Sequence, residues 1–193
     1  MGHSWFNQKR LRTEKIPSIA EIINIAESIP KINIRALYSL LYITAARIRE
    51  IIPDRKNNFP SIIKADFSFS YKDDRKYISI NIRNEKHKKK KRKEIPFPLD
   101  KEENITLWSF IKEYLDTLKL NDELFPFSYQ YAYRQLKPHI GGNPHWLRHI
   151  RLTHLITVYN FNENLLQRYA GWTDTRPSKA YAELNTSDIL DKL

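Results

Sequence analysis

Apolar residues recur at helical spacing in the first part of the chain after residue 16. Ser18 followed three residues later by Glu21 is a capping box, and the apolar residues behind it predict a helix that ends before Pro30. A second apolar run predicts another helix over residues 33–53, with Arg47 near its end.

The pattern then changes to the alternation of apolar and polar positions that is typical of strands. Residues 67–71 and 78–82 alternate in this way on either side of Asp73 and Asp74, which predicts a β-hairpin. Residues 94–98 add a short third strand, and its prolines predict an edge position because proline cannot donate to a ladder.

Helical spacing returns in the second half. Asp100 with Glu103 predicts another capping box, opening a helix that runs through Leu118. Further helices are predicted near residues 128–138, 145–159, 163–170 and 178–191. We therefore expect a mainly α fold with a small three-stranded antiparallel sheet, an α+β class.

Two turn signals punctuate this helical half. Pro138 and residues 141–144 (GGNP) predict a turn just before His145, and Gly171 stands where a helix C-terminal cap belongs.

Composition narrows the class of protein. The chain has 193 residues of which 41% are hydrophobic, enough for one domain with a real core, and it has no cysteine. Disulfides, thiolate zinc sites and cysteine nucleophiles are therefore excluded, and no apolar stretch approaches the ~20 residues of a membrane span. We expect an intracellular protein with a flexible or vector-derived segment over residues 1–16 and one domain over 17–193.

The formal net charge is +11, which favours a polyanionic partner because excess lysine and arginine displace counterions from phosphates. Seven lysines and arginines lie within residues 86–93, and the rest of the chain still carries +4. A basic loop that only aids solubility would explain part of this positive charge. An RNA-binding hairpin would explain the charge but no other feature of the sequence.

Three stretches carry candidate chemistry. Residues 44–50 (TAARIRE) and 145–149 (HWLRH) each place an arginine among apolar neighbours, and residues 171–181 (GWTDTRPSKAY) place Tyr181 nine residues after a tryptophan. Taken singly, each has an ordinary structural interpretation: Arg47 as an ion-pair partner of Glu50, and Tyr181 as a packed side chain.

Taken together and in order, these stretches resemble the tyrosine recombinase (integrase) family. That family has an arginine in a T-G-x-R-x-x-E segment, a lysine in a β-hairpin, H-x-x-R, G-[HW], and a tyrosine nine residues later. The matching positions are Arg47 with Glu50, a hairpin lysine, His145 with Arg148, Trp172 after Gly171, and Tyr181. The resemblance covers residues 17–193 and implies the catalytic domain of that family.

The resemblance implies cleavage and rejoining of DNA through a bond between Tyr181 and a 3′ phosphate. Arg47 and Arg148 would stabilise the negative charge on the phosphate oxygens without a metal. His145 would accept or orient the phenolic proton, and Trp172, in place of the commoner histidine, could donate its indole N–H to a phosphate oxygen.

A hairpin lysine is the general acid in the family, and two positions compete for this role here. Lys86, in the context NEKH, is favoured over Lys88, which has the shorter spacing to the following strand. The remaining cations of the run, expected to contact phosphates without specificity, are Lys89, Lys90, Lys91 and Arg92.

Other residues in the motifs have supporting interpretations. The family glycine of the first motif is replaced by Ala45 or Ala46, which a helix accepts easily. Glu50 is expected to orient Arg47 or His145 rather than to bind metal, so neither a metal nor another cofactor is implied. His149 and His154 are expected to be structural, because these two histidines are not three or four residues apart.

The implied partners are double-stranded DNA attachment sites and other copies of the chain, in a tetramer on DNA, with no membrane. Family members place a core-binding domain before the catalytic one, and residues 1–16 are too few to form it. The isoleucine-rich and lysine-rich composition suggests an AT-rich genome, such as that of an archaeal virus or plasmid, for which the family activity would be viral genome integration. A catalytically inactive DNA-binding module of the same fold and a type IB topoisomerase remain alternatives.

Overall fold

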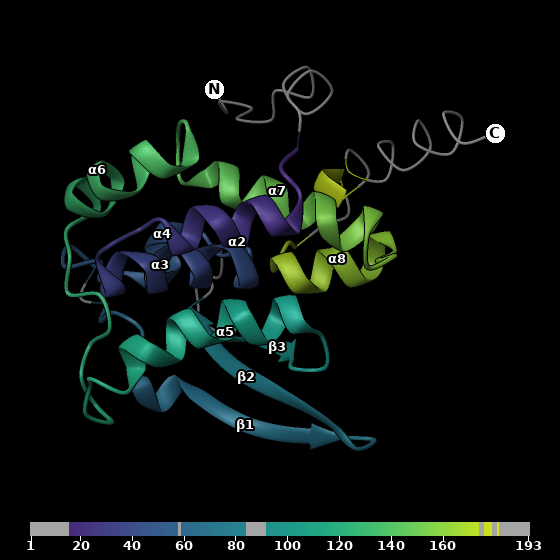
Figure 1. The fold of residues 1–193 in the computed structure, drawn as a ribbon, viewed down its shortest axis with the longest axis horizontal. Coiled ribbons are helices and arrows are strands. Elements are labelled where there is room, and N and C mark those ends of the chain that lie inside the picture. Colours follow the sequence, from purple (N-terminus) through teal and green to yellow (C-terminus); the bar gives the residue numbers. More distant parts are fainter. Residues whose placement is uncertain (1–15, 58, 84–91, 174–175, 179–180, 182–193) are drawn as a thin grey trace.

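The computed structural model describes residues 16–57, 59–83, 92–173, 176–178 and 181. Helices form one side of the molecule, and a small sheet lies on the other (Figure 1). The predicted class, mainly α with a three-stranded antiparallel sheet, is confirmed. None of the described helices has the length and apolarity needed to cross a membrane.

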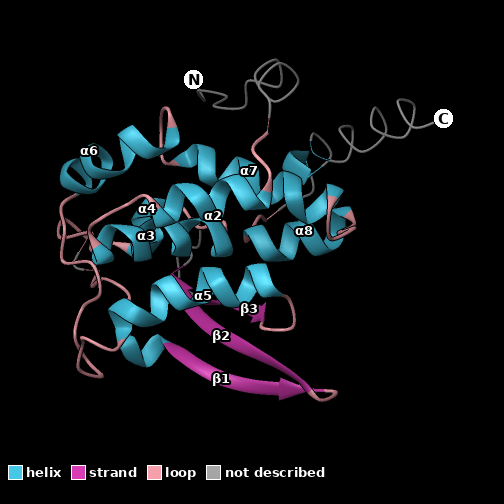
Figure 2. Ribbon diagram, in the orientation of Figure 1, coloured by secondary structure: helices cyan, strands magenta, loops and turns pink. Residues whose placement is uncertain are grey.

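The elements follow one another along the chain as follows. The helices are α2 (Ile19–Glu27), α3 (Ile32–Thr44), α4 (Ile48–Ile51), the 3₁₀ turn η1 (Lys64–Asp66), α5 (Glu102–Leu115), α6 (Tyr129–Ile140), α7 (His145–Thr157) and α8 (Glu163–Ala170). The strands are β1 (Phe67–Lys72), β2 (Arg75–Arg83) and β3 (Arg92–Pro98), all between α4 and α5 (Figure 2).

The sheet has the predicted order β1-β2-β3, and both neighbouring pairs are antiparallel. Asp73 and Asp74 both have positive φ, 50° and 62°, as a tight two-residue hairpin turn requires. In β3 the alternation turns Ile95 and Phe97 into the core, and β3 lies at an edge as its prolines predicted.

Helix α3 lies at the centre of the molecule, because apolar residues surround it and it packs against α5 and α7. Trp108 of α5 covers Phe67 and Phe69 of β1, which joins the sheet to the helices. A second apolar cluster, around Leu152 and Leu155 of α7, contains the side chain of Tyr181.

The single helix predicted over residues 33–53 is wrong, because the chain breaks after Thr44. Ala45 caps α3 in the left-handed conformation, with φ 46°, and Arg47 lies just outside the first turn of α4. The alanine that replaces the family glycine is therefore not inside a helix. It has the left-handed conformation, which glycine adopts without strain and which is less favourable for alanine.

Two smaller predictions are also corrected. The capping box of Asp100 does not form: α5 begins at Glu102 after Lys101, and its first turn carries Glu102 and Glu103, which suit the positive end of the helix dipole. Pro138 lies within the last turn of α6, and the turn before His145 begins at Gly141, with φ 62°. Of the helix predicted over 178–191, all but Ser178 and Tyr181 lie outside the described residues.

The strain at Ala45 gives a prediction with a neighbouring control. Ala45 and Ala46 are both buried, but Ala46 does not have positive φ. Because the left-handed conformation costs an L-residue about 1–2 kcal/mol, we expect Ala45→Gly to be more stable than Ala46→Gly by about 1 kcal/mol. Urea unfolding followed by circular dichroism measures this difference, and equal stabilities would show that Ala45 is unstrained.

Candidate active site

Residues far apart in the sequence meet where α4, β3, α7 and the end of α8 come together. Glu50 of α4 is the centre of this group, and it is only 3% exposed. One carboxylate oxygen of Glu50 accepts from the Arg47 guanidinium at 3.1 Å, and the other accepts from the Arg47 backbone N–H at 2.9 Å. The expected pairing of Glu50 with Arg47 is therefore present, and it fixes the guanidinium beside the break in the helix.

The buried carboxylate of Glu50 also faces Lys93 of β3, whose Nζ lies 3.7 Å from it. Burial alone would raise the pKa of the Glu50 carboxyl, but the positive charges of Lys93, Arg148 and Arg47 outweigh burial and lower it. Glu50 therefore stays ionised inside the protein, where it attracts cations from three segments of the chain.

Lys93 is a site residue that sequence reasoning missed. It was counted with the basic run, yet its side chain is only 10% exposed, and its Nζ donates to the Ala170 carbonyl at 3.4 Å. The signal was available: in a strand, Lys93 shares a face with the buried Ile95 and Phe97, two and four residues on. Burial lowers the pKa of the Lys93 amine to about 8; Glu50 opposes this shift, while Arg148 and Arg47 add to it.

Arg148 of α7 is almost fully enclosed, with 2% exposure. Its guanidinium donates to the Ala170 carbonyl at 2.9 Å and to the Ala45 carbonyl, and it lies 5.5 Å from the ring centre of Trp172. The last carbonyls of α8 carry the negative end of its dipole, so they hold Arg148 as well as Lys93. Burial lowers the pKa of Arg148 to about 10, which leaves it charged at neutral pH.

The phenol of Tyr181 is fully buried and lies near enough to Arg148 for the charge of the arginine to act on it. Its ring is nearly parallel to that of Trp172, with centres 5.9 Å apart, and its hydroxyl is hydrogen-bonded to Nδ1 of His149. Burial raises the pKa of the Tyr181 phenol well above its usual value, and Arg148 only partly offsets this rise. The hydroxyl is therefore protonated in this state.

The histidine at the Tyr181 hydroxyl is thus His149, which sequence reasoning assigned to structure. His145 stands one turn earlier on α7, edge-on to His149 with ring centres 4.8 Å apart. Burial lowers the pKa of His145 to about 3, and the neighbouring His149, Arg148 and Arg47 add to this effect against the opposing charge of Glu50. His145 is therefore neutral, and its expected role toward Tyr181 stays a prediction.

The candidate lysines and most of the basic run fall outside the described residues. These positions are Lys86, Lys88, Lys89, Lys90 and Lys91. Arg92 is described: its half-exposed guanidinium forms an ion pair with Asp66 at 2.6 Å and donates to the Asn81 carbonyl at 2.7 Å. Its assignment to DNA contacts remains a prediction.

Solved structures share this architecture. A XerH site-specific recombinase bound to difH substrate, in a pre-cleavage complex, superposes with a TM-score of 0.62 and 19% sequence identity, over 87% of this chain and 51% of that one. A XerH post-cleavage complex with palindromic difH substrate gives 0.63 and 17%, over 92% and 53%. The XerA recombinase gives 0.53 and 19%, over 90% and 59%.

This chain has the catalytic-domain fold of the tyrosine recombinases. It spans between 51% and 59% of the length of those recombinase chains. No protein-family model and no curated protein sequence matches it. The likeness therefore shows the fold alone.

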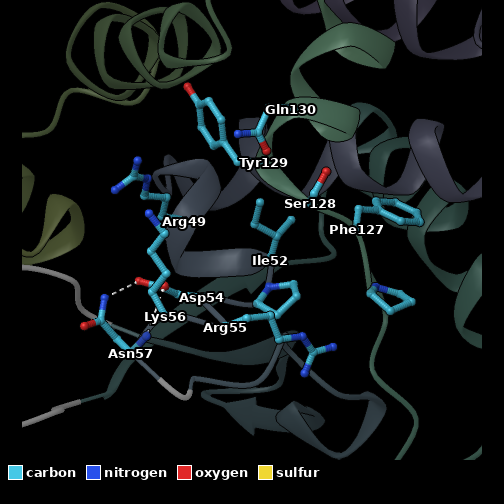
Figure 3. A pocket seen from close by; sticks show the side chains of 12 residues that line it. Arg49, Ile52, Asp54, Arg55, Lys56, Asn57, Phe127, Ser128, Tyr129 and Gln130 are labelled. Atoms are coloured by element: carbon cyan, nitrogen blue, oxygen red, sulfur yellow. Dashed lines mark hydrogen bonds between the residues drawn. The ribbon is translucent and has the colours of Figure 1, made fainter.

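A hollow of about 520 Å³ lies apart from the group around Glu50, between the segment after α4 and the start of α6 (Figure 3). Arg49, Arg55 and Lys56 line it together with the aromatic rings of Phe127 and Tyr129. None of the candidate catalytic residues lines this hollow. Among the described residues, histidine, aspartate and glutamate side chains form no group of three that could hold a metal ion.

Because the Glu50 carboxylate is buried, we expect loss of its partner Lys93 to cost more stability than loss of the exposed Lys112. Lys93→Met leaves part of a buried charge without its partner, so we expect a loss of about 3–5 kcal/mol in unfolding free energy. The control is Lys112→Met, which breaks the exposed pair of Lys112 with Asp116 and should cost less than about 1 kcal/mol. Urea unfolding measures both, and equal losses would contradict the role given to Lys93.

The neutral state of His145 predicts acid sensitivity. The unfolded chain takes up a proton on this imidazole near pH 6.5, whereas the folded chain takes it up only near pH 3. The unfolded state therefore binds more protons between these values, and stability falls as the pH falls below 6.5. Between pH 6.5 and 5, His145→Asn should lose less stability than the unsubstituted chain, by up to about 2 kcal/mol. Urea unfolding of both proteins at both pH values measures these losses. Equal losses in the two proteins would contradict the prediction.

Proposed function

We propose that the chain is the catalytic part of a site-specific recombinase that cuts and rejoins duplex DNA through a covalent bond between Tyr181 and a 3′ phosphate. The observation that carries the proposal is the convergence of Arg47, Arg148 and Tyr181 within a fold that the chain shares with the XerH and XerA recombinases. Such a convergence from three distant segments is not needed to build the core.

The charges suit a phosphodiester. Arg47, Lys93 and Arg148 surround the single carboxylate of Glu50, so the group carries an excess of positive charge. Attack on phosphorus builds negative charge on the non-bridging oxygens, and fixed guanidinium groups stabilise that charge without moving during the reaction. Arg47 is partly exposed and can reach a bound phosphate first.

The nucleophile would be the phenolic oxygen of Tyr181. In the structure this oxygen is covered, so binding of DNA has to bring it and a phosphate together. Trp172 contacts both the Tyr181 ring and the Arg148 guanidinium, so a small shift of Trp172 would expose the arginine to the phosphate. Its indole N–H could then donate to a phosphate oxygen.

The leaving 5′ oxygen needs a proton, which a lysine of the basic hairpin would supply. Lys86 and Lys88 remain the candidates for this general acid, and the remaining cations from Lys89 to Arg92 would contact the DNA backbone. The partners proposed for the intact protein are double-stranded attachment sites and further copies of the chain, assembled as a tetramer. Integration of a viral genome is one biological role that this activity would serve.

Covalent capture tests the proposal. A library of nicked duplexes with a randomised centre traps a recombinase on its substrate, because the short strand released by cleavage diffuses away. We expect a protein–DNA adduct that resists denaturation, and we expect Tyr181→Phe to abolish it without weakening DNA binding, since only the nucleophilic oxygen is lost. Arg148→Ala should also prevent the adduct.

The matched control is Tyr169→Phe. The Tyr169 hydroxyl donates to the Ile43 carbonyl in the core, so its loss should alter stability alone. Peptide mapping of the adduct identifies the linked residue. An adduct that persists in Tyr181→Phe, or that maps to another tyrosine, would overturn the assignment. A chain that binds duplex DNA but captures no member of the library would favour the inactive DNA-binding module.

A further inference from the structure

The hydroxyl of Tyr181 is held by a partner that the family resemblance does not assign. Nδ1 of His149 is hydrogen-bonded to this hydroxyl, and the two rings lie nearly parallel, at 24°, with centres 6.1 Å apart. Trp172 is also nearly parallel to the phenol. The reacting oxygen is therefore directed at one ring nitrogen of His149.

The direction of this hydrogen bond depends on the tautomer of His149. Burial keeps the phenol protonated, so its hydroxyl can donate to the lone pair of Nδ1 when His149 carries its ring proton on Nε2. This tautomer of His149 is part of the proposal below. The neighbouring His145 is neutral, so it carries one ring proton and places no positive charge beside His149.

We propose that His149 is the proton acceptor for Tyr181, an inference that rests on the proposed function. As the phenolic oxygen forms its bond to phosphorus, the phenolic proton passes to Nδ1 of His149, and the bond from phosphorus to the 5′ oxygen breaks. The hairpin lysine protonates the departing 5′ oxygen. In rejoining, the imidazolium of His149 returns the proton to the phenolic oxygen as that oxygen leaves the phosphate.

Position separates His149 from His145 in this role. Both lie on α7, one turn apart, and both rings are near the site. A hydrogen bond joins the Tyr181 hydroxyl to Nδ1 of His149. The charges of Arg47 and Glu50 both act on His145, and from this position His145 can contact a phosphate instead.

The test uses His149→Asn, because the asparagine Oδ1 occupies about the position of Nδ1 and still accepts a hydrogen bond but cannot take a proton. We expect adduct formation with a captured library member to slow by about 10²–10⁴-fold with unchanged DNA binding. Introducing a fluorinated tyrosine at position 181, whose more acidic phenol needs less help from a base, should recover at least about tenfold of this loss. His139→Asn on α6 is the matched control and should cleave normally.

A second measurement does not depend on cleavage. Nitrogen NMR of the His149 ring should find Nδ1 without a proton, with a resonance that shifts in Tyr181→Phe. A proton on Nδ1 would overturn the proposal. So would His149→Asn cleaving as fast as the unsubstituted chain or faster, because the bond would then only hold Tyr181 in place. Failure of the unsubstituted chain to form any adduct would overturn both proposals, whereas an adduct unaffected by His149→Asn overturns this one alone.

Discussion

The ionised carboxylate of Glu50, buried at the junction of α4 and β3, is the constraint on which the site depends. A charge removed from water is costly unless it is paired and hydrogen-bonded, and here Arg47 and Lys93 supply the partners. The need to neutralise one carboxylate fixes the chain break before α4 against the edge strand of the sheet. Arg148 joins the same group through the carbonyls at the ends of α3 and α8.

The same arrangement explains why the site favours an anion. One carboxylate cannot balance three cations, so the group has a net positive charge in surroundings of low dielectric constant, where charge interactions are strong. Burial has a second effect on the neutral groups: it keeps Tyr181 protonated and His145 unprotonated. Under the proposed function, a phosphate that enters would meet fixed positive charge, and Tyr181 would stay inactive as a nucleophile until its proton is removed.

Much of the fold could be predicted from periodicity and turn residues, because the hairpin with Asp73 and Asp74 and the cap at Gly171 depend on local sequence. The break at Ala45 could not, since alanine normally favours a helix and tertiary packing imposes its left-handed conformation. Lys93 was hidden within a run of solvent-exposed cations, although its strand alternation pointed inward. The bond of His149 to Tyr181 depends on how two helical segments pack, which their spacing in the sequence does not specify.

The central claim is that fixed guanidinium charge stabilises the phosphate during cleavage, and a neutral substrate tests it most directly. In a methylphosphonate at the scissile position, a methyl group replaces one charged oxygen, so less negative charge develops there. The measurement is the rate of adduct formation by Arg148→Ala on the phosphodiester and on the methylphosphonate form of a captured sequence. The account predicts that the variant fails on the phosphodiester and regains cleavage on the methylphosphonate; an equal loss on both substrates would contradict it.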